Sequence, residues 1–150
     1  MSDLTPDELR GLPLGRLLLH AHRRAQAASL AKLQQRGHAQ VRPGHLPVIT
    51  NLDPEGTRIS DLANRSGMTR QMMGRLVREL AGLGYLATRP DPADQRAVVV
   101  TMTDRGTALG TDAAAVIAEL EEEYARLLGD PDLSGLRAAL AGIIDASPTA

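Results

Sequence analysis

The stretch that decides the fold runs from Arg58 to Thr103 and reads RISDLANRSGMTRQMMGRLVRELAGLGYLATRPDPADQRAVVVTMT. Its first part has the pattern of two helices joined by a tight turn. Ser60 and Thr69 each stand just ahead of a helical pattern, where a side-chain oxygen can cap free backbone N–H groups. Gly67 lies between them and is the residue type most tolerant of a sharp turn. We therefore expect a short helix, a turn and a longer helix.

The longer helix has two different faces. Apolar residues at helical spacing predict its buried side: Met73, Leu76, Val77, Leu80 and Leu83. The opposite side carries a basic and polar set: Arg70, Gln71, Gly74, Arg75 and Arg78. Arg can pair with guanine and Gln with adenine through two hydrogen bonds, and other Arg side chains can hold phosphates. Because Gly74 has no side chain, the backbone there could approach a DNA groove closely.

A simpler interpretation is an amphipathic helix whose basic face is only solvated. Two features that follow in the sequence count against it. Gly82-Leu83-Gly84 is a helix stop. After it, Tyr85–Arg89 and Ala97–Thr101 have the composition of strands, and the turn-rich segment Pro90–Arg96 joins them. Two helices followed by a hairpin indicate a winged helix-turn-helix, in which the second helix reads DNA.

The tip of the expected hairpin carries an acidic and a basic residue two positions apart, Asp94 and Arg96. We expect Asp94 to orient Arg96 for insertion into the minor groove, since narrow A·T tracts attract Arg there. The alternative is ordinary turn chemistry, in which Asp94 serves only the backbone.

Extended to Gly106, this stretch resembles the core of the MarR family of transcriptional regulators. The family's LAxxxG element is found at Leu62-Ala63 and Gly67, and its apolar-residue-after-glycine element at Gly84-Tyr85. Its wing element, an Arg followed by Asp-x-Arg, is found at Arg89, Asp94 and Arg96, and its TxxG element at Thr103 and Gly106. The resemblance implies a homodimer on a pseudo-palindromic operator, DNA contacts that include Ser60, Thr69 and Arg89, and small anionic or phenolic effectors.

Long helices are expected on both sides of this stretch. One runs from Leu14 to about Arg36 and ends at Gly37. A second helix lies between about Gly44 and Leu52, and it either begins at Pro47 or bends there, because proline removes a helical hydrogen bond. Beyond the hairpin, Thr103 caps a long helix that ends near Leu128, and a last helix follows the break at 129–132.

We therefore expect a mainly α (α+β) fold: a winged helix-turn-helix with long N- and C-terminal dimerisation helices. Residues 1–150 form one domain, with the winged lobe at about 46–103 and the dimerisation helices at about 13–36 and 104–146. The flanking helices have more apolar surface than the small lobe can cover. Since burial contributes about 25 cal/mol per Å², a two-fold dimer is expected, with its two recognition helices about one DNA turn apart.

Composition excludes several classes of protein. The chain has no cysteine, which excludes disulfides and cysteine-ligated metals, and no Phe or Trp, which disfavours binding of single strands by base stacking. It has no apolar run of about 18 residues and no signal-like N-terminus, so we expect a soluble cytoplasmic protein. The net charge is −1, but residues 58–105 hold eight Arg against five acidic residues, whereas residues 110–150 hold two against eight. The basic segment is the expected DNA reader.

No spacing of histidines and carboxylates suits a metal, and no phosphate loop or nucleophile motif is present, so we expect neither a cofactor nor enzymatic activity. The resemblance places an effector between the dimerisation helices and the winged lobe. The residues expected to line that cleft are Arg16, His20, Arg23, Arg24 and His45. Their alternative role is as solvated or interhelical residues.

These observations predict a sequence-specific, ligand-responsive, homodimeric repressor that binds double-stranded DNA. The alternative is a small-molecule-binding or scaffold protein of the same fold that does not read DNA. Arg70, Arg75, Arg78 and Arg96 on one surface would favour the first.

Overall fold

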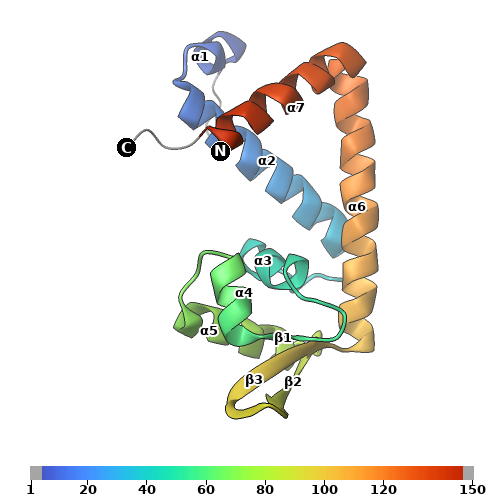
Figure 1. Ribbon diagram of the computed structural model, residues 1–150. Coiled ribbons are helices and arrows are strands. Elements are labelled where there is room, and N and C mark those ends of the chain that lie inside the picture. Colours follow the sequence, from blue (N-terminus) through green and yellow to red (C-terminus); the bar gives the residue numbers. More distant parts are fainter. Residues whose placement is uncertain (1–4, 147–150) are drawn as a thin grey trace.

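The computed structural model describes residues 5–146 as a winged lobe joined to a set of long terminal helices (Figure 1). In chain order the elements are α1 (Pro6–Arg10), α2 (Leu14–Gln35), a 3₁₀ turn (Pro43–His45), α3 (Leu46–Thr50), β1 (Thr57–Arg58), α4 (Ile59–Arg65), α5 (Arg70–Gly82), β2 (Leu86–Asp91), β3 (Asp94–Met102), α6 (Asp104–Leu128) and α7 (Asp130–Asp145). The expected mainly helical winged fold is confirmed. Residues 1–4 and 147–150 of the expected single domain lie outside the described residues.

The helix boundaries follow the expected caps where those caps are local. The Thr69 side chain accepts from the Met72 N–H at 3.1 Å, and that of Thr103 accepts from the Gly106 N–H at 3.1 Å. Gly37 and Gly84 have positive φ angles of 97° and 81°, a backbone conformation that glycine adopts without strain, just beyond α2 and α5. The open question at Pro47 is settled: α3 begins at Leu46, with Pro47 in its first turn, where a missing N–H costs no helical bond.

Two elements differ from the sequence analysis. The wing is a three-stranded sheet in the order β1-β3-β2 rather than a two-stranded hairpin, because Thr57 and Arg58 pair with Val100 and Val99. Its hairpin is also longer than expected, since β2 reaches Asp91 and β3 starts at Asp94. The β2–β3 register shifts between Pro90 and Asp91, where proline lacks a ladder donor.

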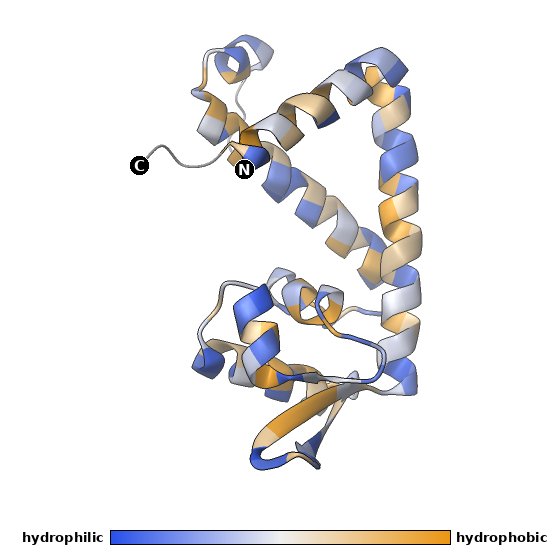
Figure 2. Cartoon of the chain, viewed as in Figure 1, coloured by the Kyte–Doolittle hydropathy of each residue, from blue (hydrophilic) through white to orange (hydrophobic). Residues whose placement is uncertain are grey.

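The core lies in the lobe and continues along α6. Most of the predicted apolar side of α5 is buried: Met73, Leu76, Val77 and Leu80. The last predicted position, Leu83, is the C-cap residue and is half-buried. Further buried side chains come from α2, the segment after it, α3 and α6: Leu33, Val41, Val48, Leu109, Val116 and Leu120. Figure 2 shows apolar residues inside the lobe and, in addition, along the terminal helices. The described part of the chain contains no helix long and apolar enough to span a membrane.

Tyr85 joins the lobe to α6. Its side chain is fully buried, and its hydroxyl lies 3.0 Å from Nδ1 of His38, whose Nε2 lies 2.9 Å from an Asp112 carboxylate oxygen. The Tyr85 carbonyl accepts from the Thr103 N–H at 3.1 Å. Gly106 packs so closely on that carbonyl that a Cβ there would lie 2.1 Å from the oxygen.

Ion pairs hold α2 against α6 on the other side of this joint. Lys32 Nζ lies 3.3 Å from a Glu119 carboxylate oxygen and 2.9 Å from one of Glu123, and Arg36 also pairs with Glu119. Hydrogen bonds from Lys32 and then Arg36 lower the pKa of Glu119, while partial burial opposes them. The angle between the two helices is therefore fixed by charge as well as by packing.

The close approach of Gly106 to Tyr85 predicts a large effect of one added methyl group. Gly106→Ala should lower the free energy of unfolding by about 2–4 kcal/mol, because backbone has to move to admit the Cβ. Gly110→Ala is the matched control in the same helix. Its nearest contact would be Met102 Sδ at 4.0 Å, so it should stabilise the fold by up to about 1 kcal/mol. Urea unfolding followed by circular dichroism measures both, and equal stabilities would refute the close contact.

Candidate nucleic-acid interface

The recognition helix α5 presents four long polar side chains to solvent. Arg70, Gln71, Arg75 and Arg78 are exposed, as is the apolar Met72, whereas Met73, Leu76 and Val77 are buried in the lobe. This division follows from the helical spacing of the sequence, and the Thr69 cap fixes where the first turn begins. The side chains needed for base and phosphate contacts therefore share one helix face.

Gly74 does not form a bare patch on that face, which corrects the sequence analysis. Gly74 is buried, and a Cβ built there would meet Arg78 Nη1 at 3.6 Å. Positions four apart on a helix are neighbours, so the long Arg78 side chain covers the gap that glycine leaves. A DNA groove would meet the Arg78 guanidinium before it met this backbone.

Ser60 is not the N-cap of α4, which is a second correction. The helix begins at Ile59 after β1, and Arg58 occupies the N-cap position without a side-chain hydrogen bond. Because Thr57 and Arg58 pair with β3, the N-cap is Arg58, two residues earlier than the predicted Ser60. Ser60 instead lies in the first turn, half-buried beside the wing.

A hollow of about 480 Å³ lies between the wing and the start of α5. We call it the wing hollow; its polar lining is Arg58, Ser60, Arg70, Asp94 and Arg96. Four of these five are predicted DNA-contact residues, and they come from three separate elements. The fold therefore brings the start of the recognition helix and the wing tip to one concave surface. Arg89 is exposed on β2 and lies outside this lining.

Asp94 contacts the backbone of Arg96 rather than its guanidinium. Its Oδ1 accepts from the Arg96 N–H at 3.0 Å, which is the ordinary turn chemistry named as the alternative. Asp91, to which the sequence analysis gave no role, also accepts a backbone hydrogen bond, at the other end of the turn. One oxygen accepts from the Ala93 N–H at 2.8 Å and the other from Arg58 Nε at 2.5 Å. The turn sequence Asp-Pro-Ala-Asp could have indicated both contacts, because an aspartate often accepts a hydrogen bond from the backbone N–H two residues later.

Asp91 is ionised for a local reason. The hydrogen bond from the Ala93 N–H, followed by the Arg58 contact and the nearby charge of Arg89, lowers its pKa, and partial burial opposes the shift. An anionic Asp91 therefore fixes Arg58 to the wing.

A second charged cluster lies near the C-terminal half of α5. Glu79 accepts from His45 Nε2 at 3.1 Å, pairs with Arg42, and lies 3.9 Å from Arg75 Nε. The His45 hydrogen bond is the main cause of the lowered pKa of Glu79; desolvation opposes it, and the charges of Arg42 and Arg75 add to it. Arg75, on the exposed face, thus makes only a long ion-pair contact with this cluster.

His45 is committed to this cluster rather than free for an effector. Its side chain is about 1% exposed, and Nδ1 lies 3.2 Å from the backbone N of Arg42. Because a backbone N–H can only donate, Nδ1 accepts and the ring proton lies on Nε2, facing Glu79. The predicted grouping of His45 with the α2 residues is therefore not seen.

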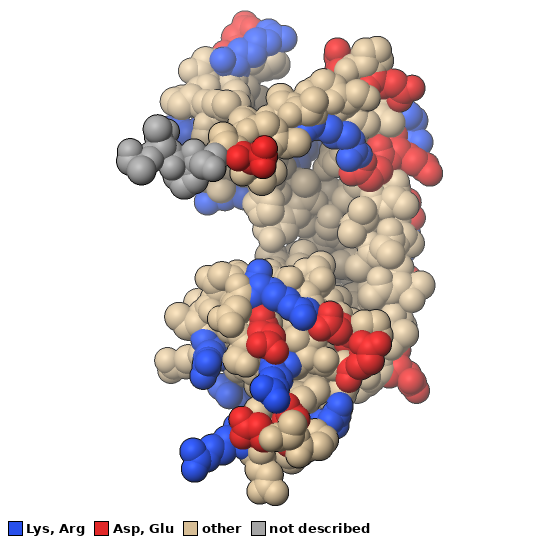
Figure 3. Space-filling view, in the orientation of Figure 1, with Lys and Arg blue, Asp and Glu red and all other residues tan. Residues whose placement is uncertain are grey.

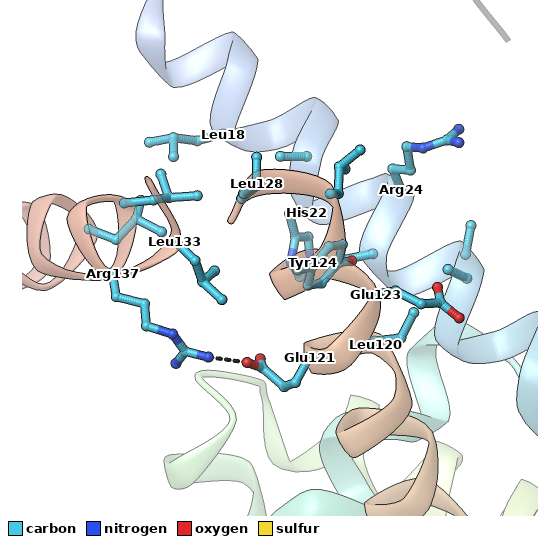
Figure 4. Close-up of a pocket in the computed structure, with 17 residues that line it drawn as sticks. Leu18, His22, Arg24, Leu120, Glu121, Glu123, Tyr124, Leu128, Leu133 and Arg137 are labelled. Carbon is cyan, nitrogen blue, oxygen red and sulfur yellow. Dashed lines mark hydrogen bonds and ion pairs between the residues drawn. The ribbon is translucent and has the colours of Figure 1, made fainter. Parts of the chain in front are cut away.

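A cavity of about 980 Å³ lies between α2, α6 and α7, not between these helices and the lobe (Figure 4). Its lining is mostly apolar and includes Leu18, Leu120, Tyr124, Leu133, Leu136 and Leu140. Of the predicted effector residues only Arg24 lines it, and its guanidinium points away from Tyr124. Arg16, His20 and Arg23 lie elsewhere on α2, whereas His22, which was not predicted, does line the cavity.

Charge is distributed unevenly over the visible face. In Figure 3 basic and acidic side chains mix over the lobe, and acidic ones gather where α6 meets α7. The wall between the lobe and the terminal helices is largely uncharged in this view. Among residues 5–146 no group of three His, Asp or Glu side chains is placed to hold a metal ion.

Comparisons with known proteins agree with this geometry. Residues 39–97 match the model of the MarR family. A transcriptional repressor, CouR, solved bound to a 23-mer DNA duplex, is similar to the chain with a TM-score of 0.75 and 27% identity, over 95% of this chain and 99% of that one. The comparison with curated proteins finds no match.

Two other solved structures have the same fold. Wild-type MarR from E. coli, in its apo form, has a TM-score of 0.71 and 19% identity over 88% of this chain and 96% of that one. A MarR-family regulator from Rhodococcus sp. RHA1 has a TM-score of 0.70 and 22% identity over 99% of this chain and 100% of that one.

The Glu79 cluster predicts a pH dependence of stability. Because the pKa of Glu79 is lower in the folded protein than in the unfolded chain, its ionisation stabilises the fold above about pH 4.3, and the contribution is lost as pH falls through the lower folded value. Urea unfolding between about pH 6 and pH 3 should show a steeper loss for the wild type than for Glu79→Gln. Glu122→Gln, at an exposed position of α6, should follow the wild type. If the free energy of unfolding fell equally with pH in the wild type and in Glu79→Gln, ionised Glu79 would not stabilise the fold.

Proposed function

We propose that this chain, which belongs to the MarR family of winged helix-turn-helix DNA-binding transcriptional regulators, is a sequence-specific, ligand-responsive repressor acting as a homodimer on a pseudo-palindromic operator. Transcription regulators of this family are non-enzymatic, in agreement with the expected lack of enzymatic activity. The observation that carries the DNA-reading part is the wing hollow, where Arg70 of α5 and Arg96 of the wing meet on one surface. A scaffold without DNA-reading activity would not need that convergence.

Within the recognition helix we assign different roles to different residues. Gln71 and Arg75 lie on the exposed face and are proposed to contact bases, while Arg70 and Arg78 contact phosphates. Arg75 is exposed and makes only a long ion-pair contact with Glu79, at 3.9 Å, so its guanidinium can reach a base. Arg70, unlike the other three, lines the wing hollow, where the backbone of a DNA strand would pass.

The repressor role is proposed by analogy with one relative. CouR, the similar protein solved on DNA, is described as a transcriptional repressor. A dimer bound to its operator would act by occupying the site.

The homodimer is proposed from the exposed apolar side chains of the terminal helices. They lie on α2, α6 and α7: Leu14, Leu19, Ile117, Leu127, Leu128, Leu136, Ile143 and Ile144. No side chain of α7 is buried in the single chain, although the helix contains three leucines and two isoleucines. Fully covering one such residue contributes roughly 1.5–3 kcal/mol, so a second copy packed on α2, α6 and α7 is favoured.

The effector is proposed to bind in the cavity between the terminal helices. That cavity has apolar walls, with His22 and Arg24 on its lining, which suits a small aromatic anion. A relative of the same fold, BpsR of Bordetella bronchiseptica, has its DNA binding regulated by 6-hydroxynicotinic acid. That compound is a suitable probe: it should release DNA from the wild type and less from His22→Ala, and no release by this or related aromatic acids would count against an effector here.

DNA selection tests the central proposal. The wild type should enrich a related, inverted-repeat sequence set from a pool of random duplexes. Arg75→Ala should then lose about 1–3 kcal/mol and relax preference at one position in each half-site, because a base contact is lost. Arg70→Ala should weaken binding to all sequences alike. Failure of the wild type to enrich any sequence would favour the scaffold alternative.

A charge placed in the apolar surface tests the dimer. Leu136→Asp should shift the protein from dimer to monomer in light scattering at micromolar concentration, and weaken operator binding at least about tenfold, since a buried unpaired charge is costly. Ser134→Asp adds the same charge at an exposed position of α7 outside the cavity lining and should remain dimeric. A wild-type monomer that binds DNA tightly would refute the proposal.

A further inference from the structure

We propose that the wing hollow binds one phosphate of the DNA backbone, with Arg58 as its principal ligand. The sequence analysis gave no role to Arg58. The inference rests on the proposed DNA-binding function. It adds the place on the protein where one DNA strand would pass.

The lining of the hollow favours an anion. It contains three guanidinium groups, from Arg58, Arg70 and Arg96, and one carboxylate, from Asp94. Asp94 already accepts the Arg96 N–H, which uses part of its acceptor capacity. When Asp91, the partner of Arg58, is counted as well, three guanidinium groups meet two carboxylates, so the net charge is still positive. The Ser60 hydroxyl is a further donor.

Arg58 is held in place before any ligand arrives. Its backbone pairs with Val99 in the wing sheet, and its Nε donates to the buried Asp91 at 2.5 Å. Within residues 5–146 this is the one hydrogen bond that the structure gives to the Arg58 guanidinium, and about 41% of the side chain is exposed. The terminal N–H groups can therefore donate to a ligand, and little rotamer entropy remains to be lost on binding.

The position of the hollow identifies the anion as a backbone phosphate. A recognition helix lies in the major groove and a wing tip reaches the adjacent minor groove. One sugar–phosphate strand separates these grooves, so it has to pass between α5 and the wing, where the hollow lies. Arg is well suited to a phosphate diester because its planar N–H groups match two phosphate oxygens.

Phosphate chemistry could also come from a free anion such as inorganic phosphate. The two sources differ in their consequences. A backbone phosphate adds to the salt dependence of DNA binding, because a counterion is released from the duplex. A free anion would instead compete with DNA for the same side chains.

The experiment compares wild type, Arg58→Gln and Arg126→Gln on the sequence enriched by the wild type. Arg126 is the control, an arginine that likewise pairs with one carboxylate, that of Glu122, but lies on α6, outside the lobe. Arg58→Gln should bind every sequence roughly tenfold more weakly, with unchanged preference and a salt slope smaller by about one. Ethylation interference should lose one phosphate per half-site, between the major-groove and minor-groove contacts. Arg126→Gln should match the wild type.

Arg58→Lys guards against a folding defect, since it keeps the charge and loses only the planar fork. With an unchanged melting temperature it should retain the wild-type salt slope and the interference signal. Replacing chloride by inorganic phosphate at equal ionic strength should affect wild type and Arg58→Gln alike.

Three outcomes would overturn the proposal. An unchanged slope and interference pattern in Arg58→Gln, with intact wild-type selection, removes the phosphate site and leaves the proposed function. If inorganic phosphate competes with DNA for the wild type but not for Arg58→Gln, the hollow binds a free anion instead of a backbone phosphate. A wild type that binds no duplex DNA removes the proposed function and the phosphate site together.

Discussion

The packing of α6 on the Tyr85 carbonyl is the constraint on which the rest of the structure depends. At this point the end of the recognition helix, the start of the wing and the first turn of α6 meet, and only a residue without a Cβ fits at Gly106. The tyrosine hydroxyl continues the contact to His38, and His38 to Asp112, so the segment after α2 is held at the same joint. Arg105 closes the outer side, with its guanidinium 4.4 Å from the centre of the tyrosine ring. The lobe therefore has a fixed orientation on the long helix.

With a fixed joint, a movement of the terminal helices would be passed to the side chains that are proposed to contact DNA. Lys32 and Arg36 couple α2 to α6, and α6 carries Gly106. Within the lobe, β1 ties the loop before α4 to the central wing strand, and Asp91 ties Arg58 to the turn. Arg58 and Arg96, which are far apart in sequence, thus belong to one sheet.

Local rules of sequence predicted the parts of the fold that depend on neighbours along the chain. The caps at Thr69 and Thr103 and the apolar side of α5 needed only residues a few positions apart. The parts that were missed depend on distant partners. Thr57 and Arg58 form a strand only because Val100 and Val99 accept them, and that pairing moved the start of α4 away from Ser60. Gly74 was expected to be bare because a helical pattern does not show which way the long Arg78 side chain lies. His45 was grouped with α2 because its partner Glu79 lies 34 positions away.

The unequal charge of the chain gives the molecule an electric dipole. Residues 58–105 have eight arginines against five acidic residues, while residues 110–150 have two against eight, and Figure 3 shows acidic side chains gathered where α6 meets α7. In the field of a polyanion such a molecule turns its lobe toward the duplex and its C-terminal helices away before contact. Rotational search is shortened, and encounters through the wrong face are repelled. Because this torque acts over about a Debye length, roughly 8 Å at physiological salt, it increases the rate of association more than the lifetime of the complex.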